Sequence, residues 1–382
     1  MKFRINFSLV LLILLMAGCF NSAIAVTPEK IKVDLFEAHQ PVKEVSIYGP
    51  VHLKQPVQKI LPAGKYSVLA KSDNLELLKL GGQQPVIVAP RIVLDGQAVG
   101  VTLGLDNDKR TYPGDVEVSL LPKQSLRVRN LVPVKDYIIG VVSSETPANW
   151  PVEALKAQAV LTQTRIARHL PSMVVGDSTQ RELYLGSSNN RKEVKEAVHS
   201  VWGQILVHDQ RPVAVFYHST CAGGTSGGEA VFSNKSAVPP YLVPVNCDYC
   251  NKSPFNKLTI RRISKDVATK AFGDGLPAIL DYDDAGRPVK VKLPDGRVMS
   301  GYQFWILLGQ VAGWDKAPGS KYKLGTLPSG DIQVFSTGAG HGVGLCQWGS
   351  AELAHQGKSY KDILQYYFPG TALQESRSVA MW

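Results

Sequence analysis

The sequence predicts an α+β protein in which a β-rich N-terminal region precedes a mixed domain of helices and strands. From about residue 30 to 130, short strand-like runs alternate with Pro, Gly and Asp-Gly turn signals. Helical periodicity appears clearly only after residue 150, where it is interleaved with further strand-like runs. With 382 residues, 44% of them hydrophobic and 19% charged, the chain is long enough for two or three domains.

The N-terminal region, residues 26–120, is expected to contain the first strands. Its clearest strand-like runs are residues 43–48, 66–70, 85–89 and 115–120. Beta-branched residues and a two-residue alternation characterise them, and turn residues separate them. No cluster of residues in this region indicates chemistry.

The mixed domain, residues 121–382, carries the helices. Residues 151–170 form an amphipathic pattern with Pro151 in the first turn and Glu153 placed favourably for the helix dipole. An insertion is expected at about 255–335. Further helices are predicted at 191–201, 301–308, 350–357 and 359–367, and strands at 204–208 and 212–217.

The junction at residues 136–158 is the most informative stretch. A strand-like apolar run ends at Glu145, and a Pro-started helix follows within a few residues. A carboxylate between two such elements lies where loops form clefts. By itself this position equally suits a solvated loop carboxylate or a helix cap.

The first 25 residues have the pattern of an export signal. Lys2 and Arg4 precede the apolar run at residues 7–17, and Ala23-Ile24-Ala25 provides small residues for cleavage. Lipoprotein processing at Cys19 is the alternative. We therefore expect a periplasmic or envelope-associated protein.

The chain is basic, with a formal net charge of +10. Removing the signal, with two basic and no acidic residues, leaves 10 − 2 = +8. In an exported protein this balance favours anionic envelope polymers, although solubility alone also accounts for it. No Lys/Arg run resembles a nucleic-acid patch, so no nucleic-acid partner is expected.

The four cysteines beyond the signal allow two interpretations. His218-x-x-Cys221 and Cys247-x-x-Cys250 form two ligand pairs with the spacing of a tetrahedral structural zinc site, and Cys346 is the alternative to His218 as fourth ligand. Outside the cytoplasm, an even number of cysteines equally indicates two disulfides.

Five segments in order carry a family resemblance: Glu145, residues 154–160 (Ala-Leu-Lys-Ala-Gln-Ala-Val), 217–225 (Tyr-His-Ser-Thr-Cys-Ala-Gly-Gly-Thr), 340–349 (Gly-His-Gly-Val-Gly-Leu-Cys-Gln-Trp-Gly) and 367–371 (Tyr-Phe-Pro-Gly-Thr). With them, the chain resembles the stage II sporulation protein D and amidase-enhancer family over roughly residues 110–375. The resemblance implies a protein that acts on peptidoglycan. Its best understood members are lytic transglycosylases that cut glycan strands stripped of stem peptides.

The resemblance assigns the catalytic role to Glu145. A lytic transglycosylase needs one carboxyl group, which protonates the glycosidic oxygen and then deprotonates the 6-hydroxyl of the same sugar, giving a 1,6-anhydro product. The acid must be protonated at working pH, so we expect partial burial to raise the pKa of Glu145.

Three polar residues of the motifs are expected to bind substrate: His341 in the Gly-rich loop 338–344, Gln347 and Gln158. Two departures from the family pattern stand out. An Arg-containing segment is replaced by Thr162-Gln163-Thr164-Arg165, and the small residue usual before Gln347 is Cys346. If the family's arginine binds sugar, that role is lost here or has moved to Arg165.

Two other functions compete with the enzyme. A non-catalytic module could hold glycan and activate an N-acetylmuramoyl-L-alanine amidase, as the family's name suggests. Alternatively, the β-rich first half could serve as an adaptor to the wall or to a partner protein.

Overall fold

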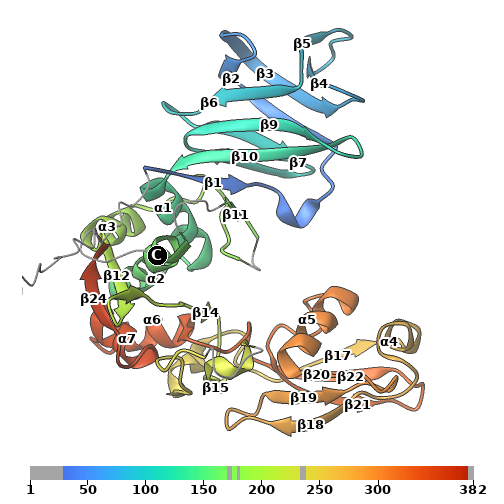
Figure 1. The fold of residues 1–382 in the computed structure, drawn as a ribbon, viewed down its shortest axis with the longest axis vertical. Coiled ribbons are helices and arrows are strands. Elements are labelled where there is room, and N and C mark those ends of the chain that lie inside the picture. Colours follow the sequence, from blue (N-terminus) through green and yellow to red (C-terminus); the bar gives the residue numbers. More distant parts are fainter. Residues whose placement is uncertain (1–28, 170–173, 179–180, 233–237, 377–382) are drawn as a thin grey trace, which may run out of the picture.

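The computed structural model describes residues 29–169, 174–178, 181–232 and 238–376. The predicted export signal, its cleavage site and Cys19 lie outside the described residues. The α+β class is confirmed: a large sheet at one end, a group of helices in the middle and a smaller α+β subdomain at the other end (Figure 1). Within the described residues, no helix is both long enough and apolar enough to span a membrane.

The N-terminal sheet has eleven strands in the described chain. In spatial order they run β11-β1-β10-β9-β6-β2-β3-β4-β5, with β7 paired to β2 and β8 to β7. The strands are β1 (Lys30–Asp34), β2 (Glu44–Gln55), β3 (Lys59–Ala70), β4 (Leu75–Lys79), β5 (Pro85–Ala89), β6 (Arg91–Asp95), β7 (Val101–Leu105), β8 (Asp108–Tyr112), β9 (Asp115–Leu121), β10 (Ser125–Pro133) and β11 (Val174–Gly176).

Alternation of side chains explains these strands. In β9, Val116 and Val118 are fully buried while their neighbours are partly exposed, which is the two-residue period of a sheet with one covered face. Three of the four predicted strand runs of this region fall within strands of the sheet, and the fourth, at 43–48, begins one residue before β2. The short strand β11 pairs in parallel with β1 and attaches the later part of the chain to the sheet.

The helices at the centre of the molecule cover one end of the sheet. They are α1 (Val134–Glu145), α2 (Val152–His169), α3 (Lys192–Ser200), α6 (Gln347–His355) and α7 (Tyr360–Tyr367). A three-stranded sheet of β12 (Gln204–His208), β13 (Arg211–Pro212) and β24 (Ala372–Glu375) completes this part. The helices predicted at 151–170, 191–201 and 359–367 are thereby located within one or two residues.

The prediction of a strand before Glu145 was wrong. Residues 134–145 form the helix α1. Ile138, Ile139, Val141 and Val142 are all buried, so the segment is apolar on every side and lacks the amphipathic period that identifies a surface helix. A short apolar run of this kind does not distinguish a buried helix from a buried strand.

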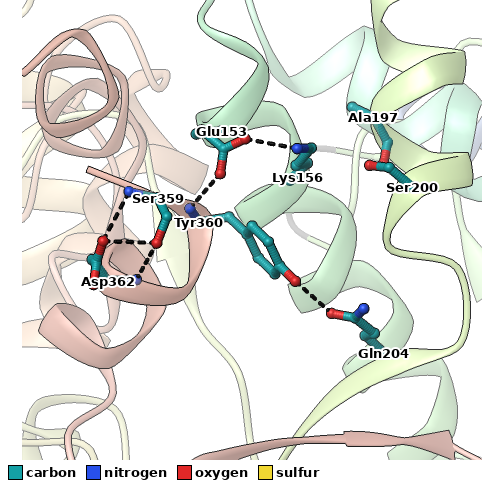
Figure 2. A network of polar contacts seen from close by, with 8 residues as sticks. All are labelled: Glu153, Lys156, Ala197, Ser200, Gln204, Ser359, Tyr360 and Asp362. Carbon is teal, nitrogen blue, oxygen red and sulfur yellow. Dashed lines mark hydrogen bonds and ion pairs between the residues drawn. The ribbon is translucent and has the colours of Figure 1, made fainter. Parts of the chain in front are cut away.

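Glu153 connects α2 to α7. Its carboxylate accepts from the Lys156 ammonium (2.7 Å) and from the backbone N–H of Tyr360 (2.8 Å), and the Tyr360 hydroxyl lies 2.8 Å from the Gln204 side-chain oxygen (Figure 2). Ser359 and Asp362 form a capping box at the start of α7 in the same network. This network fixes the C-terminal helices against α2.

Residues 259–337 form a subdomain with its own core. It contains β17 (Thr259–Ile263), α4 (Lys265–Phe272), β18 (Ala278–Tyr282), β19 (Pro288–Lys292), β20 (Val298–Ser300), α5 (Gly301–Ala312), β21 (Lys321–Thr326) and β22 (Ile332–Thr337). Phe272, Phe304, Leu308 and Tyr322 pack in its interior, separately from the main core. A capping box of Ser300 and Gln303 begins α5.

Candidate functional site

Glu145 is the last residue of α1, and this position affects its chemistry. The carbonyl end of a helix carries partial negative charge, which disfavours a carboxylate there and favours the neutral acid. The helix ends as Thr146 donates both its backbone N–H and its hydroxyl to the carbonyl of Val142. After this the chain turns sharply into α2.

The Glu145 side chain is half-buried beneath the loop that leads from β11 to α3. Its Oε1 accepts a hydrogen bond from the Leu183 backbone N–H (2.7 Å) and a longer one from the Tyr217 hydroxyl (3.4 Å). Desolvation raises the pKa of Glu145, although these donors oppose the shift. The expected direction of the pKa shift therefore agrees with the structure.

A glycine allows the loop to approach α1 so closely. A Cβ atom at Gly140 would lie 2.6 Å from the Tyr184 ring and 2.8 Å from the Gly186 carbonyl oxygen. Because glycine has no Cβ, the loop packs directly on the helix and brings Leu183 to Glu145.

A second carboxylate, Glu182, lies next to the first. Its side chain is 2% exposed, its Oε1 accepts from the Tyr217 hydroxyl (3.3 Å), and its Oε2 accepts from the Tyr137 hydroxyl (3.1 Å). Burial raises the pKa of Glu182 to about 7. Tyr217 therefore contacts both carboxylates with one hydroxyl group.

Arg165, on α2, supplies the positive charge near this pair. Its electrostatic attraction lowers the pKa of both Glu145 and Glu182, against the larger effect of burial. Gln163 faces elsewhere: its amide nitrogen donates to the Val201 carbonyl (2.9 Å), and its oxygen accepts from the Gly203 N–H (2.7 Å). Within the segment 162–165, Arg165 is therefore the residue that acts on the carboxylates, and Gln163 is not.

Gln158 and Gln347 lie together beside Glu145. The Gln347 amide nitrogen is 3.4 Å from both the Gln158 side-chain oxygen and the Glu145 backbone carbonyl. Both side chains are buried, with exposed fractions of 2% and 5%. Their position suits the orientation of Glu145, and little of either surface is open to a substrate in this state.

His341 lies in the Gly-rich loop near these residues. Its Nδ1 accepts from the Val343 N–H (3.1 Å), its ring packs edge-on against Phe216, and burial lowers its pKa to about 4. The imidazole is therefore neutral at physiological pH. The His341 ring also forms a hydrogen bond with the backbone of Tyr217. Tyr217 is the residue whose hydroxyl contacts both carboxylates.

His341 also borders a groove of about 450 Å³ between the Gly-rich loop and the 259–337 subdomain. The groove is lined mainly by apolar and aromatic side chains: Phe255, Tyr302, Trp305, Ile306, Trp314 and Pro318, together with Ala339 and Gly340. Trp314 is 37% exposed, so part of its indole is open to solvent. Aromatic faces with a few polar groups are typical of a ligand site.

A parallel pair of short strands joins two of the sequence motifs. In β14 (Tyr217–His218) and β23 (Leu345–Cys346), Tyr217 is paired with Leu345 and His218 with Cys346. The pairing helps to bring Tyr217 and Gln347, which are far apart in sequence, to Glu145: Tyr217 contacts its side chain and Gln347 its backbone carbonyl.

Four cysteines form a buried cluster behind the same strands. Ligand atoms of Cys221, Cys247, Cys250 and Cys346 all lie within 4.8 Å of one another, and all four are free thiols. Four sulfurs bound to zinc at about 2.3 Å would be about 3.8 Å apart in a tetrahedron. The cluster thus has the donor set and spacing to hold a metal ion.

Hydrogen-bond donors surround these sulfurs. The backbone N–H groups of Cys221 and Gly349 donate to the Cys346 sulfur (3.3 and 3.4 Å), and the Tyr367 hydroxyl lies 3.1 Å from the Cys247 sulfur. Such donors stabilise thiolates and orient ligands around a metal.

His218, predicted as the fourth ligand, lies outside this cluster. Its Nδ1 is 3.1 Å from the Val343 carbonyl oxygen, and its ring packs against His341. The alternative ligand, Cys346, takes the fourth position. The parallel pairing places His218 beside Cys346. Of these two residues, only Cys346 has its ligand atom in the cluster with Cys221, Cys247 and Cys250.

Comparison with known proteins identifies the family. Residues 122–208 match the family described as stage II sporulation protein. Stage II sporulation protein D of Bacillus subtilis (strain 168) is 30% identical over 270 residues, which cover 64% of this chain and 75% of that protein. The chain belongs to the stage II sporulation protein D family.

Two more relatives agree with this assignment. Stage II sporulation protein D of Bacillus amyloliquefaciens is 28% identical over 271 residues, covering 65% of this chain and 76% of the relative. The amidase enhancer of Bacillus subtilis (strain 168) is 25% identical over 294 residues, covering 61% of this chain and 40% of the relative. The family resemblance predicted from the motifs is confirmed.

The sequence did not single out Glu182 or the Leu183 N–H. Both belong to an irregular loop, and no spacing links them to Glu145. Tyr217 stood in a motif, directly before His218, but without a role. The one signal that could have identified Tyr217 was its position in the chain just before the candidate metal ligands His218 and Cys221.

Proposed function

We propose that this protein is a peptidoglycan lytic transglycosylase in which Glu145 is both acid and base. The observation that carries the proposal is the setting of Glu145: half-buried at a helix C-terminus, held by the Leu183 N–H and Tyr217 hydroxyl, and with its pKa raised by burial. Burial favours the neutral form of this carboxyl group, which is the form that protonates a glycosidic oxygen.

In the proposed reaction, the proton of Glu145 moves to the glycosidic oxygen as the bond from C1 breaks. The resulting carboxylate then takes the proton of the substrate's 6-hydroxyl, whose oxygen bonds to C1 and closes the anhydro ring. Arg165 and the Leu183 N–H stabilise the transient carboxylate by charge and hydrogen bonding. Glu145 ends the cycle protonated.

We further propose that the glycan strand occupies the aromatic groove bordered by His341. The exposed part of Trp314 offers a flat apolar face to a pyranose ring, and the His341 imidazole borders the same groove. The strand would be stripped of stem peptides, in keeping with the family resemblance.

Product analysis tests the enzyme proposal. Peptide-free glycan strands are incubated with wild type and with Glu145→Gln, and 1,6-anhydro ends are measured by mass spectrometry. The wild type is expected to produce such ends, and the variant to lose nearly all activity. Absence of product from wild type that binds the glycan would contradict the proposal, and equal activity of the variant would move catalysis away from Glu145.

The second candidate is a glycan-binding activator of an N-acetylmuramoyl-L-alanine amidase. The similarity to an amidase enhancer favours it, as does the separately packed 259–337 subdomain, which offers a surface to a partner. In that case Glu145→Gln would leave stimulation of a cell-wall amidase unchanged, and the wild type would produce no anhydro ends.

The metal held by the four cysteines is proposed to be zinc in a structural role. A four-thiolate set is typical of closed zinc sites that have no position open for substrate. Bound there, zinc would fix β23 to the segments around Cys221 and Cys247. Metal analysis of protein purified without chelator should give one zinc per chain, and two disulfides without zinc would contradict this.

Export is proposed from the N-terminal signal, with release at Ala25 or lipid attachment at Cys19 as the two routes. A substrate in the cell wall requires such a location. Mass determination of the mature protein distinguishes them, because a lipidated Cys19 at the N-terminus adds acyl mass.

A further inference from the structure

Glu182 is a buried carboxylate for which the fold supplies no direct cation. Its side chain is 2% exposed, and within the described chain it takes part in no ion pair. Two tyrosine hydroxyls, from Tyr137 and Tyr217, contact its two oxygens. A carboxylate kept in such a costly position requires a reason beyond packing, because an apolar residue would fill the same space without desolvating a charge.

Tyr217 links this group to the proposed catalytic acid. Its hydroxyl oxygen is 3.4 Å from Glu145 Oε1 and 3.3 Å from Glu182 Oε1. A tyrosine hydroxyl has one proton to donate, so it serves one carboxylate at a time and accepts from the other when that group is protonated. The three side chains thus form a continuous hydrogen-bonded chain.

We propose that Glu182 is a positioning residue coupled to Glu145 through Tyr217, so that ionisation of either carboxyl group disfavours ionisation of the other. This inference rests on the proposed role of Glu145 as acid. When Glu182 is ionised, it accepts from Tyr217 and its charge opposes ionisation of Glu145. When Glu145 has given its proton to the substrate, the Tyr217 hydroxyl donates its hydrogen bond to the new Glu145 carboxylate, and the proton returns to Glu145 from the substrate's 6-hydroxyl.

Arg165 and two tyrosines are the charged and titratable groups with the clearest effect on the pair. Arg165 on α2 attracts both carboxylates and balances one negative charge shared between them. Tyr137 on α1 and Tyr217 on β14 remain neutral, since burial holds their pKa values well above 10. The charge of Glu145 raises the pKa of Glu182, so the ionisation of the two carboxyl groups is coupled.

Glu182→Gln is the first test, because it removes the charge while preserving the side chain's shape. Losing a like charge nearby should lower the pKa of Glu145 by about one to two pH units. The high-pH limit of anhydro-product formation, which requires protonated Glu145, should move down by the same amount. A purely structural contribution of Glu182 would reduce activity at every pH without moving the limit.

Tyr137→Phe is the second variant and guards against misfolding of the first. It removes a donor that favours ionised Glu182, so Glu182 becomes less charged and the pKa of Glu145 should fall by less than in Glu182→Gln. Glu153→Gln is the matched control, since Glu153 faces Lys156 and Tyr360 instead of the pair (Figure 2). It should leave the pKa of Glu145 unchanged.

A direct titration separates this inference from the proposed activity. Full-length protein with isotope-labelled glutamate carboxyl groups is titrated by NMR, and Glu145→Gln identifies the Glu145 signal. A lower pKa of Glu145 in both test variants supports the proposal even if the wild type cuts no glycan. An unchanged pKa of Glu145 in folded Glu182→Gln would overturn it, whether or not the enzyme proposal holds.

Discussion

The buried Glu182 makes a specific prediction for the pH dependence of stability. Burial raises its pKa in the folded protein from an ordinary value of 4.5 to about 7. Between these values the folded state binds more protons than the unfolded state, so the free energy of unfolding falls as pH rises. The contribution from Glu182 is fully present below pH 4.5 and is lost as pH rises through 7.

The magnitude follows from the pKa difference. About 2.5 pH units, at about 1.36 kcal/mol per unit, give about 3 kcal/mol. Glu182→Gln lacks this titration. Relative to wild type, the variant should therefore gain about 3 kcal/mol in unfolding free energy between pH 4.5 and pH 8, whatever its absolute stability at either pH.

Urea unfolding of both proteins at pH 4.5 and pH 8 measures this difference. Glu153→Gln is the control, because the pKa of Glu153 is shifted in the opposite direction to that of Glu182. Hydrogen bonds from Lys156 and Tyr360 lower the pKa of Glu153, so its contribution is lost as pH falls. If the stability difference between Glu182→Gln and wild type is the same at both pH values, Glu182 does not titrate as the structure requires.

Three further predictions concern the groove, the helix contact and the metal. Trp314→Ala should weaken the binding of a peptide-free glycan, measured by calorimetry, about two- to tenfold. Tyr282→Ala, which removes an exposed aromatic ring outside the groove, should leave the affinity unchanged; an equal loss of affinity in both variants would show that the glycan does not bind in the groove. Gly140→Ala should lower the free energy of unfolding by about 1–3 kcal/mol in urea, because the new methyl group meets Tyr184 and Gly186; an unchanged value would show that the loop moves freely. Cys346→Ser should reduce the zinc content of the purified protein and His218→Ala should not; the reverse result would restore His218 as the ligand.

The sequence was sufficient for the elements whose pattern is local. The alternation in residues 115–120 and the Pro-started amphipathic helix after residue 150 each carry their own signal, and both match the structure. In α1 this signal is missing, since Val141, Val142 and their neighbours are buried on all sides. Whether residues 134–145 form a helix or a strand is decided by their packing against the sheet and against the loop at Tyr184. The sequence does not display this packing.

The site could be predicted only where motifs carried it. Glu145, Gln347 and the cysteines stood in recognisable segments, and the fold brings these segments together through the pairing of β14 with β23. The choice between His218 and Cys346 depends on which side chain faces the other sulfurs, a property of three-dimensional register. Glu182 reaches Glu145 through an irregular loop packed on Gly140, so tertiary contact alone reveals it.

The central claim is that one carboxyl group, Glu145, cleaves the glycan with the substrate's own hydroxyl as nucleophile. Cleavage of peptide-free strands in water labelled with heavy oxygen tests this most directly, because ring closure takes no oxygen from solvent. The wild type is expected to yield 1,6-anhydro ends without label, and Glu145→Gln is expected to yield none. Labelled reducing ends would show that water is the nucleophile and would contradict the proposed role of the 6-hydroxyl.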